Sequence, residues 1–103
     1  MIKFVKISKK DVLFDRKNAS DILNKACSRL KPMVMTGAFE TGERIVAVLE
    51  PDTRAKLRNY AIVPVVDGSE DGLIGEVNSR YGAGFSFCFS FRIEDSVWGI
   101  FCS

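Results

Sequence analysis

Phenylalanine at every second position of one segment is the feature of this sequence that most constrains its fold. The segment 81–102 reads YGAGFSFCFSFRIEDSVWGIFC, with phenylalanine at 85, 87, 89 and 91. Successive side chains of a β-strand point to opposite faces, so this spacing predicts a strand with all these rings on one face. A second apolar run at 97–101 predicts the partner strand of a hairpin.

The phenylalanine face is predicted to be core. Burying four such rings contributes roughly 6–12 kcal/mol at about 1.5–3 kcal/mol each, which is comparable to the net stability of a typical domain. An exposed, uncharged strand of this kind would also promote aggregation. We therefore expect Phe87→Ala to lower the free energy of unfolding by about 3–5 kcal/mol.

Length and composition predict one domain spanning 1–103. The chain has 103 residues, of which 47% are hydrophobic, and this is enough to bury a core without metals or disulfides. The three cysteines stand singly, as is usual in a reducing compartment. There is no run of apolar residues long enough for a signal sequence or a membrane span. We expect a cytoplasmic protein with no membrane association.

The remaining elements follow from periodicity and from turn residues. An apolar stripe at helical spacing predicts a helix over 18–30 with Asn18 as its N-cap, and a weaker stripe predicts a second helix over 73–81. The segment 8–17 is predicted to be a loop and 52–58 a short helical turn. Pro64 indicates an edge strand or a bulge. Further strands are predicted over 2–7, 33–39, 44–50 and 60–66. The run 45–49 is apolar at every position, which suggests cover on both of its faces.

The order strand, helix, strand, strand occurs twice, over 1–51 and 59–103. In this alignment positions 33, 35, 37 and 39 correspond to 85, 87, 89 and 91. The match rests on element order and apolar register more than on identity, so a chance match stays open. The predicted fold class is α+β: a single domain built from a duplicated βαββ unit, with a mostly antiparallel sheet of about six strands and two helices packed on one face.

The sequence holds no pattern that predicts catalysis. It contains no histidine, which removes the commonest general base and the Ser-His and Cys-His pairs. Cys27 is expected to be a buried thiol late in its helix, where a thiolate is disfavoured. The cysteines are too far apart in sequence to form a ligand knuckle. No enzyme activity, catalytic residue, metal site or cofactor is predicted.

Three functional readings remain. The preferred one is a small binding or adaptor module that acts through protein contacts or self-association, as a homo-oligomer. Its candidate surface is the strand side opposite the phenylalanines: Ser86, Cys88, Ser90 and Arg92.

The alternatives rest on charge and on apolar side chains. Residues 1–31 carry nine basic and three acidic side chains, a net charge of +6, against −4 for the rest. The first alternative is nucleic-acid or acidic-partner binding through this basic segment, at Lys9, Lys10, Arg16, Lys17, Lys25 and Arg29. The second is a small-ligand pocket between sheet and helices, lined by phenylalanine, methionine and Trp98.

Overall fold

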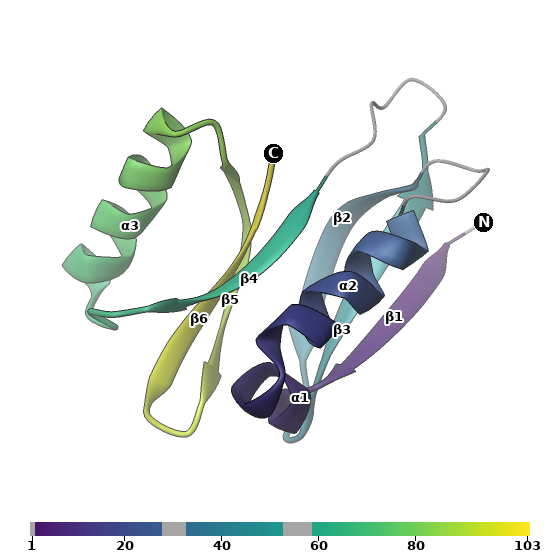
Figure 1. Cartoon of the computed structure of the whole chain (residues 1–103), viewed down its shortest axis with the longest axis horizontal. Coiled ribbons are helices and arrows are strands. Elements are labelled where there is room, and N and C mark those ends of the chain that lie inside the picture. Colours follow the sequence, from purple (N-terminus) through teal and green to yellow (C-terminus); the bar gives the residue numbers. More distant parts are fainter. Residues whose placement is uncertain (1, 28–32, 53–58) are drawn as a thin grey trace.

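A computed structural model describes residues 2–27, 33–52 and 59–103, and these form an α+β fold (Figure 1). The expected class is confirmed, with six strands and three helices in the described part of the chain. The elements are β1 (Lys3–Ser8), α1 (Lys9–Phe14), α2 (Arg16–Cys27), β2 (Met33–Glu40), β3 (Arg44–Pro51), β4 (Tyr60–Val65), α3 (Glu70–Gly82), β5 (Ser86–Ile93) and β6 (Ser96–Cys102).

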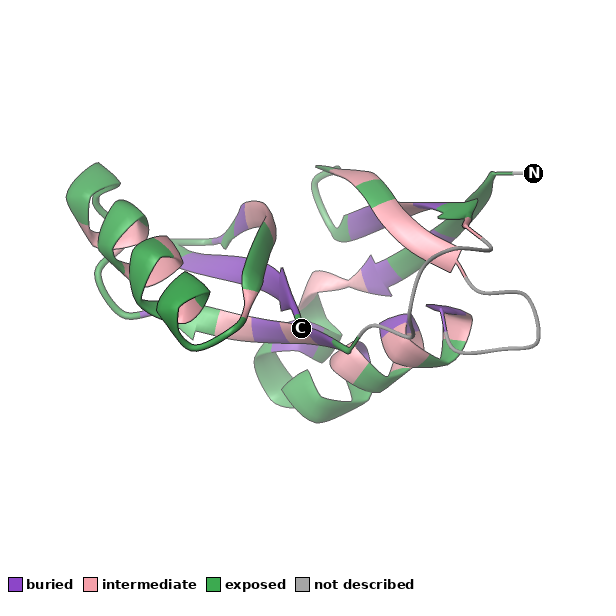
Figure 2. Ribbon diagram, turned by 90° about the horizontal axis from the view of Figure 1, so that it is seen from above, coloured by how far each residue is buried: buried purple, intermediate pink, exposed green. Residues whose placement is uncertain are grey.

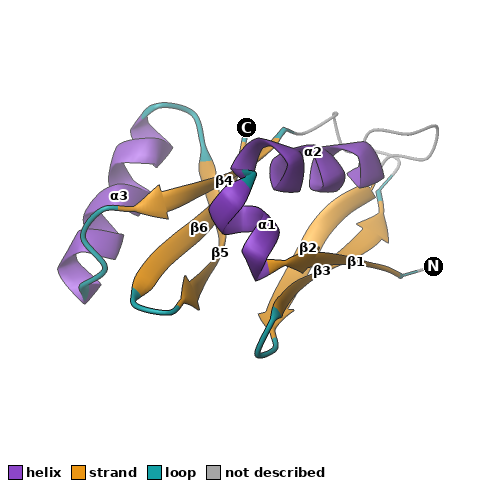
Figure 3. Cartoon of the chain, turned by 60° about the horizontal axis from the view of Figure 1, so that its bottom comes forward, coloured by secondary structure: helices purple, strands orange, loops and turns teal. Residues whose placement is uncertain are grey.

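The strands divide between two antiparallel sheets (Figure 3). Sheet A has the order β1-β3-β2 and sheet B the order β4-β6-β5. The sequence led us to expect a single sheet, but β2 and β5 approach each other without forming a ladder. Two sheets allow an apolar face of each to be buried against the other, and this shared burial favours the split.

The core lies between the sheets. Sheet A supplies β1 and β3 side chains from one face, which we call its inner face, and sheet B supplies its core face. α2 fills the space between the inner face and β4 (Figure 2). The main buried side chains are Val5, Ile7, Leu23, Ile45, Ala47, Leu49, Ile62, Phe91, Trp98 and Ile100.

The segment predicted to be a loop is helical. Ser8 caps α1, because its side-chain oxygen accepts a hydrogen bond from Lys10 N at 3.2 Å, and Val12 is fully buried. α2 begins two residues before the predicted start, and Asp15 Oδ1 accepts from Asn18 N at 3.2 Å. Asn18 is therefore inside the helix, and its prediction as the N-cap is wrong. The predicted end of this helix and most of the predicted turn at 52–58 lie outside the described residues.

Side chains of α2 bind backbone groups along one edge of sheet B, the edge formed by β4. Asn24 accepts from Tyr60 N at 2.6 Å and donates to Tyr60 O at 3.0 Å, and Ser20 Oγ accepts from Ile62 N at 3.2 Å. These backbone groups point away from β6. Pro64 follows Tyr60 and Ile62 at alternate positions of β4, so its nitrogen also faces away from β6. The N–H that proline lacks would have pointed to the edge, and no hydrogen bond of the ladder is lost. The prediction of an edge position for Pro64 is confirmed.

A β-bulge divides the phenylalanine strand. The pairing of β5 with β6 shifts between Phe87 and Phe89, so Phe87 lies opposite Phe101 while Phe89 lies opposite Ile100. Because one extra residue reverses the alternation, Phe89 and Phe91 lie on the core face and Phe87 lies on the face toward α3. The prediction that all the rings share one face is wrong. Phe91 is 2% exposed, whereas Phe87 is 40% exposed.

The two halves share more than element order. We call β1, α1, α2, β2 and β3 the first unit, and β4, α3, β5 and β6 the second unit. In each unit the last strand lies between the other two. The β2–β3 ladder contains a bulge between Met35 and Gly37, at the position that corresponds to the bulge in β5. Duplication of an ancestral unit stays a prediction that this common pairing supports.

Candidate interaction surface

The four residues predicted to form a surface do not share one face. Ser90 and Arg92 pair with residues on the α3 side of sheet B, whereas Ser86 lies opposite Cys102. Cys88 is the bulge residue and is half-buried against the core. The structure thus brings Ser90 and Arg92 together and separates them from the other two. The bulge causes this, as it does for the phenylalanines.

Ser90 and Arg92 border a hollow between β5 and the start of α3. Its volume is about 420 Å³, and Glu70 and Leu73 lie on its α3 side. Glu40, at the end of β2, also reaches it, since its carboxylate accepts from Arg92 N at 3.4 Å and pairs with Lys9 Nζ at 3.2 Å. The hollow offers both charges and hydroxyls, which suits a polar contact with a partner.

The predicted basic patch is only partly available. Lys9 is engaged by Glu40, whereas Lys10 and Lys25 are exposed on α1 and α2. Arg29 lies outside the described residues. Arg16 and Lys17 line a second hollow of about 580 Å³ together with Asp21, Glu76 and Arg80, so acidic and basic groups alternate there.

The thiols and Tyr60 meet in the interior. Burial raises the pKa of the Cys27 thiol, and Lys3 and a hydrogen bond from Tyr60 oppose this only in part. Burial also raises the pKa of Tyr60 to about 12, against the hydrogen bond that Met35 N–H donates to its oxygen, while the thiols of Cys27, Cys102 and Cys88 add to the rise. Cys27 is protonated near neutral pH, as expected for a core thiol.

Neither a metal cluster nor an exposed indole is present among the residues that the structure describes. No group of three or more candidate ligand side chains occurs there. Trp98 is buried in the core, and its Nε1 has no hydrogen-bond partner in the described part of the chain. Met33 and Met35 pack against the same core. The side chains considered for a ligand pocket thus contribute to core packing.

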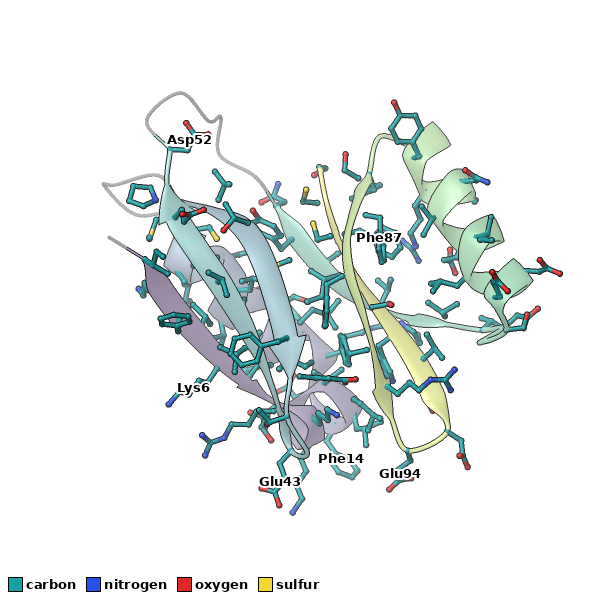
Figure 4. The ribbon with its side chains drawn as sticks, turned by 180° about the vertical axis from the view of Figure 1, so that it is seen from behind. Lys6, Phe14, Glu43, Asp52, Phe87 and Glu94 are labelled. Carbon is teal, nitrogen blue, oxygen red and sulfur yellow. The ribbon has the colours of Figure 1, made fainter. Side chains whose placement is uncertain are left out.

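An apolar surface that the sequence did not single out lies on sheet A. We define its outer face by six residues from all three strands: Phe4, Val34, Gly37, Phe39, Val46 and Val48. Cross-strand neighbours are Phe4 with Val48, and Val46 with Phe39. Phe4 is 57% and Phe39 48% exposed. Figure 4 views this side, with α2 behind the sheet and no described helix or strand in front of it.

The outer face carries charges at its margin. Lys6 follows Phe4 on the same side of β1 and lies opposite Val46, and Arg44 and Glu50 continue that side of β3. Figure 4 shows Lys6 extending from the β1 border. The available signal was the wholly apolar run at 45–49, which suggested cover on both faces. Val46 is indeed buried and Val48 half-buried on this side, although no described helix or strand lies over it.

Comparisons with known proteins found no match, so function is argued from the structure. No protein family matches the chain, and neither a curated protein nor a solved structure is similar enough to count as a match. Among the described residues, no helix has the length and apolar character needed to cross a membrane.

Proposed function

We propose that the protein is a non-catalytic binding module that acts through protein contacts, and that the outer face of sheet A is its contact surface. The observation that carries this proposal is the exposure of Phe4 and Phe39, which flank buried Val46 and half-buried Val48 on a sheet face that no described helix or strand covers. Contiguous exposed apolar patches on soluble domains mark interaction sites.

The packing of the other sheet faces supports this choice. The inner face of sheet A and the core face of sheet B cover each other, and α3 lies against the second face of sheet B. The elements at 2–27, 33–52 and 59–103 thus cover the other sheet faces but not this apolar one. Aromatic side chains are enriched at protein interfaces, and Phe4 and Phe39 lie on the two edge strands of this sheet, on either side of the valines of β3.

The other readings stay predictions. Binding of a nucleic acid through the basic residues would weaken steeply with salt, but the pairing of Lys9 with Glu40 and the mixed charges around Arg16 do not favour it. A small ligand would need an apolar pocket, but the Trp98 side chain that was expected to line it is packed in the core.

Photo-crosslinking tests the proposed surface. A photoreactive phenylalanine analogue replaces Phe39, and a matched control carries it at Phe14, which is 85% exposed on α1 and outside the outer face. In cells that express the chain naturally, we expect protein adducts from position 39 and few from position 14. Equal yields at both positions, or none at position 39, would contradict the proposal.

A further inference from the structure

The pairing registers relate the outer face of sheet A to a particular face of sheet B. Val48 lies between Phe4 and Gly37 in sheet A, as Ile100 lies between Ile62 and Phe89 in sheet B. In the same way Val46 occupies the place of Trp98, and Phe39 that of Phe91. The outer face of the first unit therefore corresponds to the core face of the second.

The protein shows what covers this type of face. In sheet B the corresponding residues Ile62, Trp98 and Ile100 are buried, and the cover is α2 with the inner face of sheet A. One interface inside the molecule thus joins the helix-free face of the second unit to the helix-bearing side of the first.

The opposite surface of each unit takes no part in this interface. The first unit exposes its helix-free outer face. The second unit exposes its helix-bearing side, which stands at the far end of the molecule (Figure 1). α3 contains no buried residue and is attached through contacts such as Arg80 over the Phe101 ring at 5.1 Å. Ile74 is 52% exposed, Tyr81 75%, and Phe87 beneath the helix 40%.

The two halves of the chain carry opposite net charges. Residues 1–51 contain ten basic and six acidic side chains, a net charge of +4, whereas residues 59–103 contain two basic and six acidic, a net charge of −4. Lys6, Arg44 and Glu50 lie beside the outer face, with one positive charge in excess, and Glu70 and Asp71 are exposed in the first turn of α3. Opposite potentials favour contact between unlike ends of two copies over contact between like ends.

We propose that the protein self-associates head to tail, with the outer face of one copy docked on the α3 side of a second copy. The inference rests on the proposed function, because it takes the outer face as the contact surface, and it adds the identity of the partner. In this contact a helix-free sheet face meets a helix-bearing side, as it does between the two units of a single molecule. Such a heterologous contact generates a ring or an open chain of copies.

Complementing variants test this arrangement. Phe4→Asp disrupts the outer face, with Phe39→Asp as a second variant should the first misfold, and Ile74→Asp disrupts the α3 side. Sedimentation analysis measures association at low salt, and circular dichroism with Trp98 fluorescence verifies the fold. We expect wild type to associate and each variant alone to associate at least about tenfold more weakly. A mixture of the outer-face variant with Ile74→Asp should form a one-to-one complex, because one intact contact remains.

Controls distinguish this proposal from the broader one. Phe14→Asp, outside both surfaces, should associate like wild type, and high salt should weaken association. If Ile74→Asp still dimerises while Phe4→Asp does not, the outer faces bind each other, and the head-to-tail arrangement is overturned but the surface retained. A wild-type monomer at all concentrations overturns self-association, and crosslinking at position 39 then decides the proposed function separately.

Discussion

Tyr60 combines burial with two structural hydrogen-bonding roles. Its hydroxyl oxygen accepts from Met35 N at 2.9 Å in the first unit, while its backbone N–H and C=O are satisfied by Asn24. It therefore joins β4 to both β2 and α2. Its phenol must stay protonated in the folded protein until strongly alkaline pH, because the buried phenolate is poorly solvated.

We predict an alkaline loss of stability that Tyr60→Phe reduces. The folded pKa of Tyr60 is about 12 against an ordinary value of 10.0. The stabilising contribution is fully present below the unfolded-state pKa and is lost as the pH rises toward the folded pKa, because only the unfolded chain releases the proton in that window. Between about pH 8 and pH 11.5 wild type should lose about 2 kcal/mol more than Tyr60→Phe.

Urea unfolding at the two pH values measures this difference. The control is Tyr81→Phe, since Tyr81 is exposed at the end of α3 and should retain the wild-type pH dependence. Identical alkaline slopes for wild type and Tyr60→Phe would show that the phenol is not shielded from water as the structure has it.

At the scale of the elements, the bulge in β5 gives neighbouring phenylalanines different energetic roles. Phe91→Ala should lower the free energy of unfolding by about 3–5 kcal/mol, as expected for a fully buried ring. Phe87→Ala should cost less, about 1–2 kcal/mol, because much of the ring already contacts water. Phe87 retains an edge-to-face contact with Phe101, with the ring centroids 5.6 Å apart. This replaces the larger cost expected for Phe87 from the sequence.

Chemical denaturation of both variants measures the two costs. A Phe87→Ala cost equal to that of Phe91→Ala would indicate that the rings share one buried face and that the pairing shift is absent. Phe14→Ala provides the exposed reference, with a change within about 0.5 kcal/mol expected.

Most elements could be predicted from the sequence, but the details of faces and caps could not. The strands and the stripe of α2 follow directly from apolar spacing, and Ala19, Leu23 and Cys27 are buried as the stripe requires. α1 was missed because it is only six residues long and its burial depends on Val12 alone. The bulge at Cys88 has no local sign, since the alternation of phenylalanine continues through it. The pairing of β5 with β6 determines where the bulge lies, and the bulge separates the residues of the predicted surface.

At the scale of the whole molecule, the core shared by the two units predicts that they unfold cooperatively. Leu23 of the first unit and Trp98 of the second belong to the same buried cluster. Leu23→Ala should therefore lower stability by about 2–4 kcal/mol, and unfolding followed by Trp98 fluorescence should shift together with that followed by circular dichroism. Trp98 is the only tryptophan, so the emission comes from one side chain of the second unit, in the core shared with the first.

The contrary result is readily recognised. If Leu23→Ala leaves the Trp98 transition unchanged while the circular dichroism transition moves, the units unfold separately. Ile74→Ala on the exposed side of α3 is the control, and its effect on both transitions should be small.

The arrangement of the two sheets could not be predicted from the sequence. Six strands and their order along the chain are compatible with one sheet or two, because local periodicity does not specify which edges meet. The choice depends on α2, which is long enough to serve both sheets and reaches β4 with Ser20 and Asn24. For the same reason the outer face could not be recognised, since exposure depends on what lies in front of a sheet.

The side chains of α2 on β4 also bear on how the protein resists misassembly. An open strand edge can recruit strands from other chains and seed fibrils. Here Asn24 engages the N–H and C=O of Tyr60, Ser20 engages the N–H of Ile62, and Pro64 supplies no donor farther along the same edge. Addition of a foreign strand along the β4 edge is therefore disfavoured, and a contact between copies at that edge has to use side chains.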